Sequence, residues 1–140
     1  MNNDCIFCSI LAGDIPSATI YEDDDILAFL DIGPIVKGHT LVIPKKHVET
    51  IHEISEEQLT AVMSGVQKVA AAQVKALGAE GVNITQANGS VAGQVVPHLH
   101  FHVIPRYADD GHHWNWNAKS YDSPEELGAV KERIIASIGA

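Results

Sequence analysis

Residues 93–106 read Gly-Gln-Val-Val-Pro-His-Leu-His-Phe-His-Val-Ile-Pro-Arg. The centre of this stretch alternates three histidines with three apolar residues: His98, Leu99, His100, Phe101, His102 and Val103. Such alternation is the period of a β-strand, whose successive side chains point to opposite faces. We therefore expect a strand over residues 98–104 that ends at Pro105, with all three imidazoles on one face. A strand that only faces solvent does not need three imidazoles, so this face is a candidate reactive site.

Length and charge limit what the rest of the chain can be. The 140 residues, of which 46% are hydrophobic, fit a single domain, 1–140, whose core needs no disulfides. The formal net charge of −9 argues against nucleic acid as a partner, because nucleic-acid-binding proteins carry basic stripes. A nucleotide stays compatible with this charge, since backbone N–H groups and a few local donors can hold phosphate inside an acidic protein.

The sequence carries no signal for export or for a membrane partner. No apolar run reaches the length of a membrane span, and the start, Met-Asn-Asn-Asp, has no signal-peptide pattern. We therefore expect a cytoplasmic protein. In such a reducing compartment, Cys5 and Cys8 indicate a metal or redox pair before a structural disulfide.

Periodicity and turn residues divide the chain into short strands and helices. Further strands are expected at residues 19–21, 26–30, 40–43 and 81–87, and a short helix at 5–11. Ser55 and Gln58 form a capping box that begins a helix over residues 56–77, which Gly78 ends. Ser123 begins a C-terminal helix in the same way. This mixture predicts an α+β fold in which helices cover an antiparallel sheet.

Several spaced motifs together resemble those of one protein family. Residues 98–104 match the histidine-triad motif, and residues 92–94 resemble the glycine-glutamine turn that precedes it. Residues 31–34 and 37–47 resemble the upstream ribose and phosphate segment. The chain, from about residue 5 to residue 116, is thus similar to the histidine triad (HIT) family, bacterial branch near Hint and Fhit. The resemblance implies a HIT-like antiparallel sheet, a homodimer whose sheets join, and a nucleotidyl hydrolase or transferase.

The resemblance also implies roles for individual residues. His100 would be the nucleophile that takes a nucleotidyl group and then passes it to water. His102 would donate to the phosphate or the leaving group, and His39 would lie against the triad. Asp31 would accept from the ribose hydroxyls, although an aspartate here can also simply cap a turn. Gln94, with the backbone N–H groups after it, would bind phosphate.

Two positions depart from the family pattern. Val95 stands where members often carry serine or threonine, and Ala87 where many have asparagine or glutamine. Asn88 lies one place later and is the remaining candidate for substrate binding, although neighbouring strand residues face opposite ways. We therefore expect a phosphate site with fewer polar side chains than is usual in the family. The expected substrate is a purine nucleotide, either a nucleoside phosphoramidate or a dinucleoside polyphosphate.

A second motif concerns a metal. Some branches of the family bind zinc through residues that match Cys5, Cys8, His47 and His98. Two sulfur and two nitrogen ligands suit a closed, tetrahedral, structural zinc site, and the reaction itself is expected to need no metal. The simpler alternative is two buried cysteines and two unrelated histidines, because free cysteine is often only a core residue.

Two other functions are compatible with the sequence. One is a nucleotide- and zinc-binding interaction module whose catalysis is vestigial. The other is a metallohydrolase that binds zinc at the three triad histidines. The remaining histidines are expected at the surface: His52, His112 and His113. Trp114 and Trp116 either cover the leaving-group side of the pocket or only pack the C-terminal segment.

Overall fold

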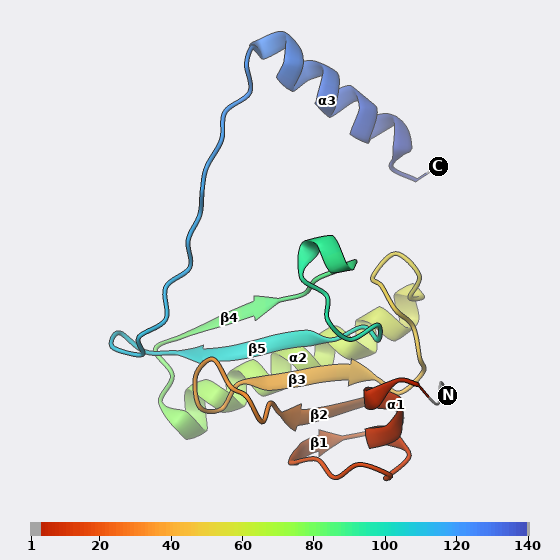
Figure 1. Ribbon diagram of the computed structural model, residues 1–140, viewed down its shortest axis with the longest axis vertical. Helices are drawn as coiled ribbons and strands as arrows, with labels where there is room; N and C mark the ends of the chain where they lie inside the picture. Colours follow the sequence, from red (N-terminus) through yellow and green to blue (C-terminus); the bar gives the residue numbers. More distant parts are fainter. Residues whose placement is uncertain (1–3, 140) are drawn as a thin grey trace.

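The structure, a computed structural model, describes residues 4–139 and contains one antiparallel sheet with a long helix on one face (Figure 1). The strands lie in the order β1-β2-β3-β5-β4. The elements in chain order are α1 (Ile6–Leu11), β1 (Thr19–Glu22), β2 (Ile26–Leu30), β3 (Thr40–Pro44), α2 (Glu56–Leu77), β4 (Gly81–Thr85), a 3-10 turn η1 (Ser90–Ala92), β5 (Phe101–Arg106) and α3 (Pro124–Ser137). The predicted α+β class is confirmed. Residues 1–3, which contribute to the expectation that no signal peptide is present, lie outside the described residues.

Helix α2 covers one face of the sheet and forms the main core with it. Buried residues of this core come from α2, from β2 and β3, and from the apolar half of the histidine stretch: Ile26, Ala28, Val42, Val62, Val66, Val69, Leu99, Phe101 and Val103. Gly65 has no side chain, which lets Ile26 pack closely against α2. Full burial of one such aliphatic side chain is worth roughly 1.5–3 kcal/mol. Leu99, Phe101 and Val103 therefore fix which way the intervening histidines face.

The opposite face of the sheet is covered by α1. Its buried cluster contains Cys5, Phe7, Cys8, Leu27, Phe29, Leu41 and Ile43. All five residues of β3 are buried, because this strand lies under α2 on one side and under this cluster on the other. His98 and His100 pack against Phe7 of this cluster, whereas His102 is half-buried.

Strand β5 differs from the predicted histidine strand. It begins at Phe101, so only His102 lies within it, and it continues through Pro105 to Arg106. The backbone before it is irregular and bonds elsewhere: the N–H of His98 donates to the carbonyl of Val96, and the N–H of Leu99 donates to the carbonyl of Val48 at 2.7 Å. The predicted strand over residues 81–87 ends earlier, at Thr85. Ladder pairing with β4 runs from Arg106 to His102, which is why the regular strand covers this part only.

The ends of α2 agree with the capping pattern. The Oγ of Ser55 accepts from the N–H of Gln58 at 3.2 Å, and Gly78 ends the helix with a φ of 64°. Glycine adopts this left-handed conformation without the steric penalty of a side chain. The predicted bounds, 56 and 77, are those observed.

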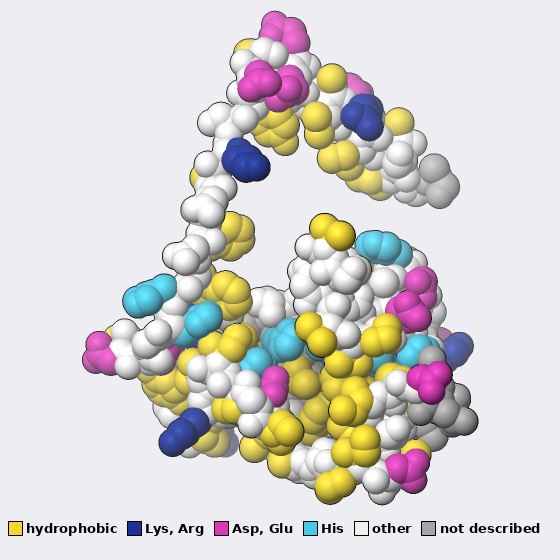
Figure 2. Space-filling view, viewed as in Figure 1, with side chains coloured by type: hydrophobic (Ala, Val, Ile, Leu, Met, Phe, Trp, Pro, Cys, Tyr) yellow, Lys and Arg dark blue, Asp and Glu magenta, His cyan; other side chains and the backbone are white. Residues whose placement is uncertain are grey.

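Helix α3 stands away from the sheet at the end of an extended segment (Figure 1). It begins as predicted, with the Oγ of Ser123 accepting from the N–H of Glu126. None of its described residues is buried, and large apolar side chains stay exposed on it and at its C-cap: Leu127 at 49%, Ile134 at 56% and Ile138 at 73%. Figure 2 shows apolar side chains along the side of this helix that faces the body of the protein.

Within residues 4–139, no helix combines the length and the apolar character that a bilayer crossing requires.

Candidate functional site

The three triad histidines divide between two clusters of side chains. His98 lies with the two cysteines and His47, whereas His102 lies with His39 and Asp31. His100 lies between them, with its ring centroid 5.0 Å from that of His102. Figure 2 shows several histidine side chains gathered on the body of the protein beneath the C-terminal arm. The hydrogen bonds of each ring determine which of its nitrogens carries the proton.

His98 offers one nitrogen to the metal cluster. Its Nε2 lies 2.8 Å from the carbonyl oxygen of Pro44. A carbonyl can only accept, so Nε2 carries the proton and Nδ1 keeps its lone pair. Burial lowers the pKa of His98 to about 4, which keeps the ring neutral. The free Nδ1 faces Cys5 and Cys8.

The same reasoning leaves His100 with a free lone pair on Nε2. Its Nδ1 lies 2.7 Å from the carbonyl oxygen of His98 and therefore carries the proton. Nε2 is left with an unshared lone pair. Burial also lowers the pKa of His100, so this lone pair is unprotonated near neutral pH. Phe7 packs edge-on against the ring with centroids 5.2 Å apart, which restricts its rotation.

His39 has the opposite assignment. The N–H of Ile35 donates to its Nδ1 at 3.2 Å, so the proton of the neutral ring is on Nε2. That Nε2–H donates to Nδ1 of His102 at 2.9 Å. The proton of His102 is thereby assigned to its own Nε2. His102 can donate a hydrogen bond from that nitrogen, beside the nucleophile.

Asp31 completes this second cluster. Its Oδ1 accepts from the N–H of Gly33 at 2.8 Å, which is the turn-capping contact weighed from the sequence. Its Oδ2 lies 3.8 Å from Nε2 of His39. The carboxylate is partly exposed and therefore reachable by a ligand. Both readings of Asp31 are compatible with this geometry.

The ligand atoms of Asp31, His39 and His102 also lie within 4.8 Å of one another, but the hydrogen bonds of this cluster do not suit a metal. Binding through Nε2 of His39 would move its proton to Nδ1, where it would meet the N–H of Ile35. The three triad rings also do not converge, because Nδ1 of His98 and Nδ1 of His102 belong to different clusters. The geometry therefore gives no support to zinc at the three triad histidines.

The Cys5, Cys8, His47 and His98 cluster fits a metal ion well. Sγ of Cys5 lies 3.4 Å and Sγ of Cys8 3.6 Å from Nδ1 of His98. Sγ of Cys8 lies 3.3 Å from Nδ1 of His47, and the two nitrogens are 3.2 Å apart. Tetrahedral coordination at ordinary bond lengths separates ligands by about 3.3 to 3.8 Å. The four side chains could therefore hold a metal with small adjustments.

Local structure prepares the ligands of this cluster. Cys5 caps α1, and its sulfur accepts from the N–H of Cys8 at 3.4 Å. Burial raises the pKa of the Cys5 thiol, so a bound cation would be needed to keep it as thiolate. A pair of buried cysteines with two buried or half-buried imidazole lone pairs matches the donor set of a structural site.

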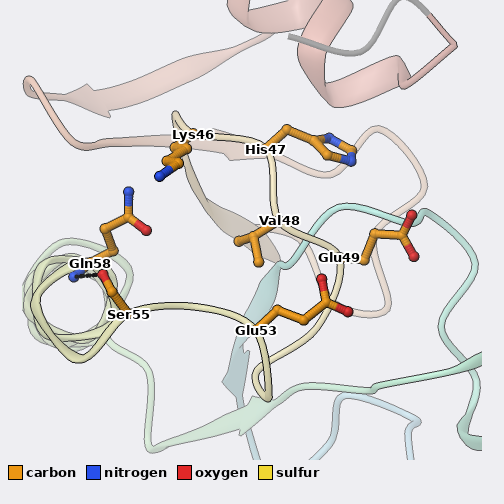
Figure 3. A pocket seen from close by; sticks show the side chains of 7 residues that line it. All are labelled: Lys46, His47, Val48, Glu49, Glu53, Ser55 and Gln58. Atoms are coloured by element: carbon orange, nitrogen blue, oxygen red, sulfur yellow. Dashed lines mark hydrogen bonds between the residues drawn. The ribbon is translucent and has the colours of Figure 1, made fainter.

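The loop that carries His47 also encloses a separate hollow of about 530 Å³ (Figure 3). It is lined by Lys46, His47, Val48, Glu49, Glu53, Ser55 and Gln58. It borders the metal cluster through His47 and contains no triad residue. It is therefore distinct from the candidate active site.

Asn88 and Gln94 already bond to their own chain. The Oδ1 of Asn88 accepts from the N–H of Ile51 at 2.8 Å and from Gln86. Gln94 accepts from the N–H of Gly89 at 2.7 Å and donates to the carbonyl of Glu49. These amides shape the turn before the triad, so a substrate would meet mainly the backbone that they hold.

Trp114 and Trp116 lie beside β4. The indole N–H of Trp114 donates to Asn83, and Trp114 and Trp116 line a hollow of about 400 Å³ with Thr85. Thr85 pairs with His102 across the ladder, so this hollow borders the site. His52 and His113 are exposed as expected, whereas His112 is half-buried.

Sequence reasoning missed three groups that shape the site. The N–H of Ile35 and the carbonyl of Pro44 are backbone atoms, and no residue pattern marks them. Phe7 appeared only as part of a short apolar helix. Its contact with His100 depends on the packing of α1 against the sheet.

The comparisons with known proteins identify the class. Residues 12–109 match the model described as HIT domain. Adenosine 5′-monophosphoramidase of Schizosaccharomyces pombe is 46% identical over 136 residues, which are 96% of this chain and 98% of that protein. The chain belongs to the HIT family.

Solved structures agree with this assignment. A crystal structure of a HIT family member from Bacillus subtilis has a TM-score of 0.91 and 44% identity, with 99% of each chain covered. A zinc-bound histidine triad family protein from Mycobacterium smegmatis has a TM-score of 0.75 and 36% identity, with 95% of this chain and 96% of that chain covered.

Acid should destabilise the protein through His102. Burial, then His100 and His39, lower its pKa from 6.5 to about 4 in the folded chain. As the pH falls, the unfolded chain binds the proton first, so the contribution to the unfolding free energy is complete above about pH 6.5 and is lost towards about pH 4. We expect urea denaturation of His102→Asn to depend less on pH across this window than that of the wild type.

The exposed His113 provides the control for this measurement, because His113→Asn should keep the pH dependence of the wild type. The assignment of a half-buried, neutral His102 fails if His102→Asn and the wild type lose the same unfolding free energy between neutral pH and about pH 4.

Proposed function

We propose that the protein hydrolyses nucleoside phosphoramidates, or transfers their nucleotidyl group, through a nucleotidyl-histidine intermediate on His100. The observation that carries this proposal is the hydrogen bond from Nδ1–H of His100 to the carbonyl of His98, which leaves Nε2 as a lone pair. The related S. pombe protein is named as an adenosine 5′-monophosphoramidase, which supports the substrate class. Dinucleoside polyphosphates are the second substrate class in the proposal.

The reaction would take place in two displacements. Nε2 of His100 attacks the α-phosphorus, the P–N bond breaks, and the leaving nitrogen takes up a proton from solution and departs as an amine. Water then attacks the phosphorus, the bond from phosphorus to His100 breaks, and the proton of the water is released to solution. Nucleoside monophosphate leaves, and the neutral imidazole is restored.

His102 would stabilise charge in both displacements. As a neutral ring that receives a hydrogen bond from His39, it donates Nε2–H to a phosphoryl oxygen and does not give up the proton. Asp31 would accept from the ribose hydroxyls, and the turn held by Gln94 and Asn88 would present backbone N–H groups to the phosphate. The base is proposed to be a purine.

A second candidate function is a nucleotide- and zinc-binding module with vestigial catalysis. Val95 is 88% exposed and offers no hydroxyl to a phosphate. The amide groups of Asn88 and Gln94 are already engaged by the chain. Nucleotide binding by the wild type without turnover of any phosphoramidate or polyphosphate would favour this candidate.

We further propose that the metal at Cys5, Cys8, His47 and His98 is zinc and that its role is structural. Support comes from the four donor atoms, which lie within 4.8 Å of one another, and from the zinc-bound relative. The metal would fix α1 to the loop before β5.

A homodimer in the cytoplasm is the proposed working form. Strand β4 is at an edge of the sheet, where a second copy could extend it. Helix α3 exposes Leu127, Ile134 and Ile138 and buries none of its described residues against its own chain. A second copy of the protein would cover this apolar face.

Replacing the nucleophile tests the enzymatic proposal. His100→Asn should bind an adenosine phosphoramidate but release adenosine monophosphate at least about a thousandfold more slowly, the scale seen when a nucleophile is removed. His102→Asn should lose rate to the same degree with good and poor leaving groups, because it supplies only a hydrogen bond. The measurement is steady-state release of the monophosphate, with His113→Asn as the control. Unimpaired turnover by His100→Asn refutes the mechanism.

Removal of the metal tests the zinc proposal. Metal analysis should find about one zinc per chain, and a chelator should lower the melting temperature. Cys8→Ser should lose zinc and stability together, whereas His52→Asn, an exposed histidine outside the cluster, should keep both. Full thermal stability of a metal-free wild type would show that the site has no structural role.

The dimer should depend on the apolar face of α3. In sedimentation equilibrium at micromolar concentration, the wild type should be a dimer. The double variant Ile134→Asp/Ile138→Asp should form a weaker dimer, which dissociates at higher protein concentrations than the wild type. Lys131→Asp, on an exposed position of the same helix, is the control for added negative charge. A strictly monomeric wild type contradicts the proposal.

A further inference from the structure

Gln73 is a buried polar residue on α2 that the proposed mechanism does not use. Its side chain is 4% exposed, among the apolar residues of the core. Its amide nitrogen donates twice, to the carbonyl of Gly38 at 3.0 Å and to the carbonyl of Val103 at 2.9 Å. One side chain thus connects the segment before β3 with strand β5.

Both acceptors are direct chain neighbours of site histidines. Gly38 precedes His39, and Val103 follows His102. Thr40 and Val103 are the end pair of the β3–β5 ladder, so Gly38 lies just beyond the paired strands. At this point the backbone pairing of β3 with β5 has ended, and the Gln73 amide connects the two segments instead.

Close packing keeps the bridge short. Gly38 has a φ of 102°, and a side chain there would meet the end of Leu77 on α2. The backbone therefore passes directly against the helix, within reach of Gln73. The pair that depends on this alignment is the 2.9 Å hydrogen bond from His39 to His102.

The chemistry of the contact requires an amide. Two carbonyl acceptors need two N–H donors from one atom, which the amide nitrogen of glutamine provides and a carboxylate or thioether does not. The other end of the side chain, Oε1, is buried without a hydrogen-bond partner in the described chain. A buried unsatisfied oxygen costs free energy, which offsets part of the stability that the two donated hydrogen bonds contribute.

We infer that Gln73 is a positioning residue, which holds His39 against His102 and so keeps the proton of His102 on Nε2. Its kinetic effect rests on the proposed function, whereas its effect on the tautomer of His102 does not. Without the bridge, the segment carrying His39 shifts relative to β5, and His102 loses the donor that fixes its Nδ1 as an acceptor.

The test compares Gln73→Met, which keeps the length of the side chain and removes both donors, with Gln67→Met at an exposed position of the same helix. Nitrogen NMR of the imidazoles should show His102 in the Nε2–H form in the wild type and in Gln67→Met. Gln73→Met should show a mixture of the two tautomers. A single Nε2–H form in folded Gln73→Met would overturn the inference.

Kinetics provide the second measurement. Gln73→Met should lower kcat by roughly tenfold to a hundredfold, the cost of misplacing a catalytic group, with KM changed less than about twofold. In a His39→Asn background the same substitution should have no further effect on kcat, because its action passes through His39. Equal losses in both backgrounds would contradict that route.

The positioning role can be tested even if Gln73→Met does not fold or the wild type shows no turnover. Should Gln73→Met fail to fold, Gln73→Glu replaces it, since the carboxylate faces the same two carbonyls and should disturb the same tautomer. A wild type without turnover would refute the proposed function and leave the NMR measurement as the deciding test. A Gln73→Glu protein that is folded and has the wild-type tautomer would refute the positioning role.

Discussion

A carbonyl oxygen accepts hydrogen bonds and cannot donate them, and this constraint fixes the protons of the site. The carbonyl of Pro44 takes the proton of His98, and the carbonyl of His98 takes that of His100. The N–H of Ile35 imposes the reverse arrangement on His39. The neutral rings therefore differ in which nitrogen is free: Nδ1 of His98 and Nε2 of His100 keep lone pairs, whereas Nε2 of His102 carries a proton. Burial lowers the pKa values of these rings, so the assignments apply to neutral imidazoles near pH 7.

His98 connects the metal cluster with the candidate active site. Its ring nitrogen belongs to the cluster with Cys5 and Cys8, and its backbone carbonyl holds the ring of His100. Loss of a bound metal would free the ring of His98 and with it the carbonyl that orients the nucleophile. A structural metal can therefore support catalysis without contacting the substrate. Leu99, between His98 and His100, is buried in the core with α2, which helps to hold both imidazoles on the opposite face.

The sequence predicted those parts that follow from short-range pattern. The capping pattern at Ser55 and the glycine at Gly78 bound α2 correctly, and the four members of the metal cluster do lie together. The backbone before Phe101 could not be predicted as irregular, because its alternation is that of a strand while its partner in space is the loop at Val48. The exposed apolar face of α3 also could not be foreseen, since helical spacing of apolar residues does not say what covers them. Partners that are backbone groups of distant segments carry no sequence signal.

The central claim is that the lone pair on Nε2 of His100 attacks phosphorus. The most direct measurement mixes excess protein with an adenosine phosphoramidate, quenches the reaction in base after a single turnover, and maps the peptide that carries the nucleotide. The account predicts adenosine monophosphate bound to His100 at early times, its disappearance as free monophosphate forms, and no adduct in His100→Asn. Formation of free monophosphate with no protein-bound nucleotide at any quench time would contradict it.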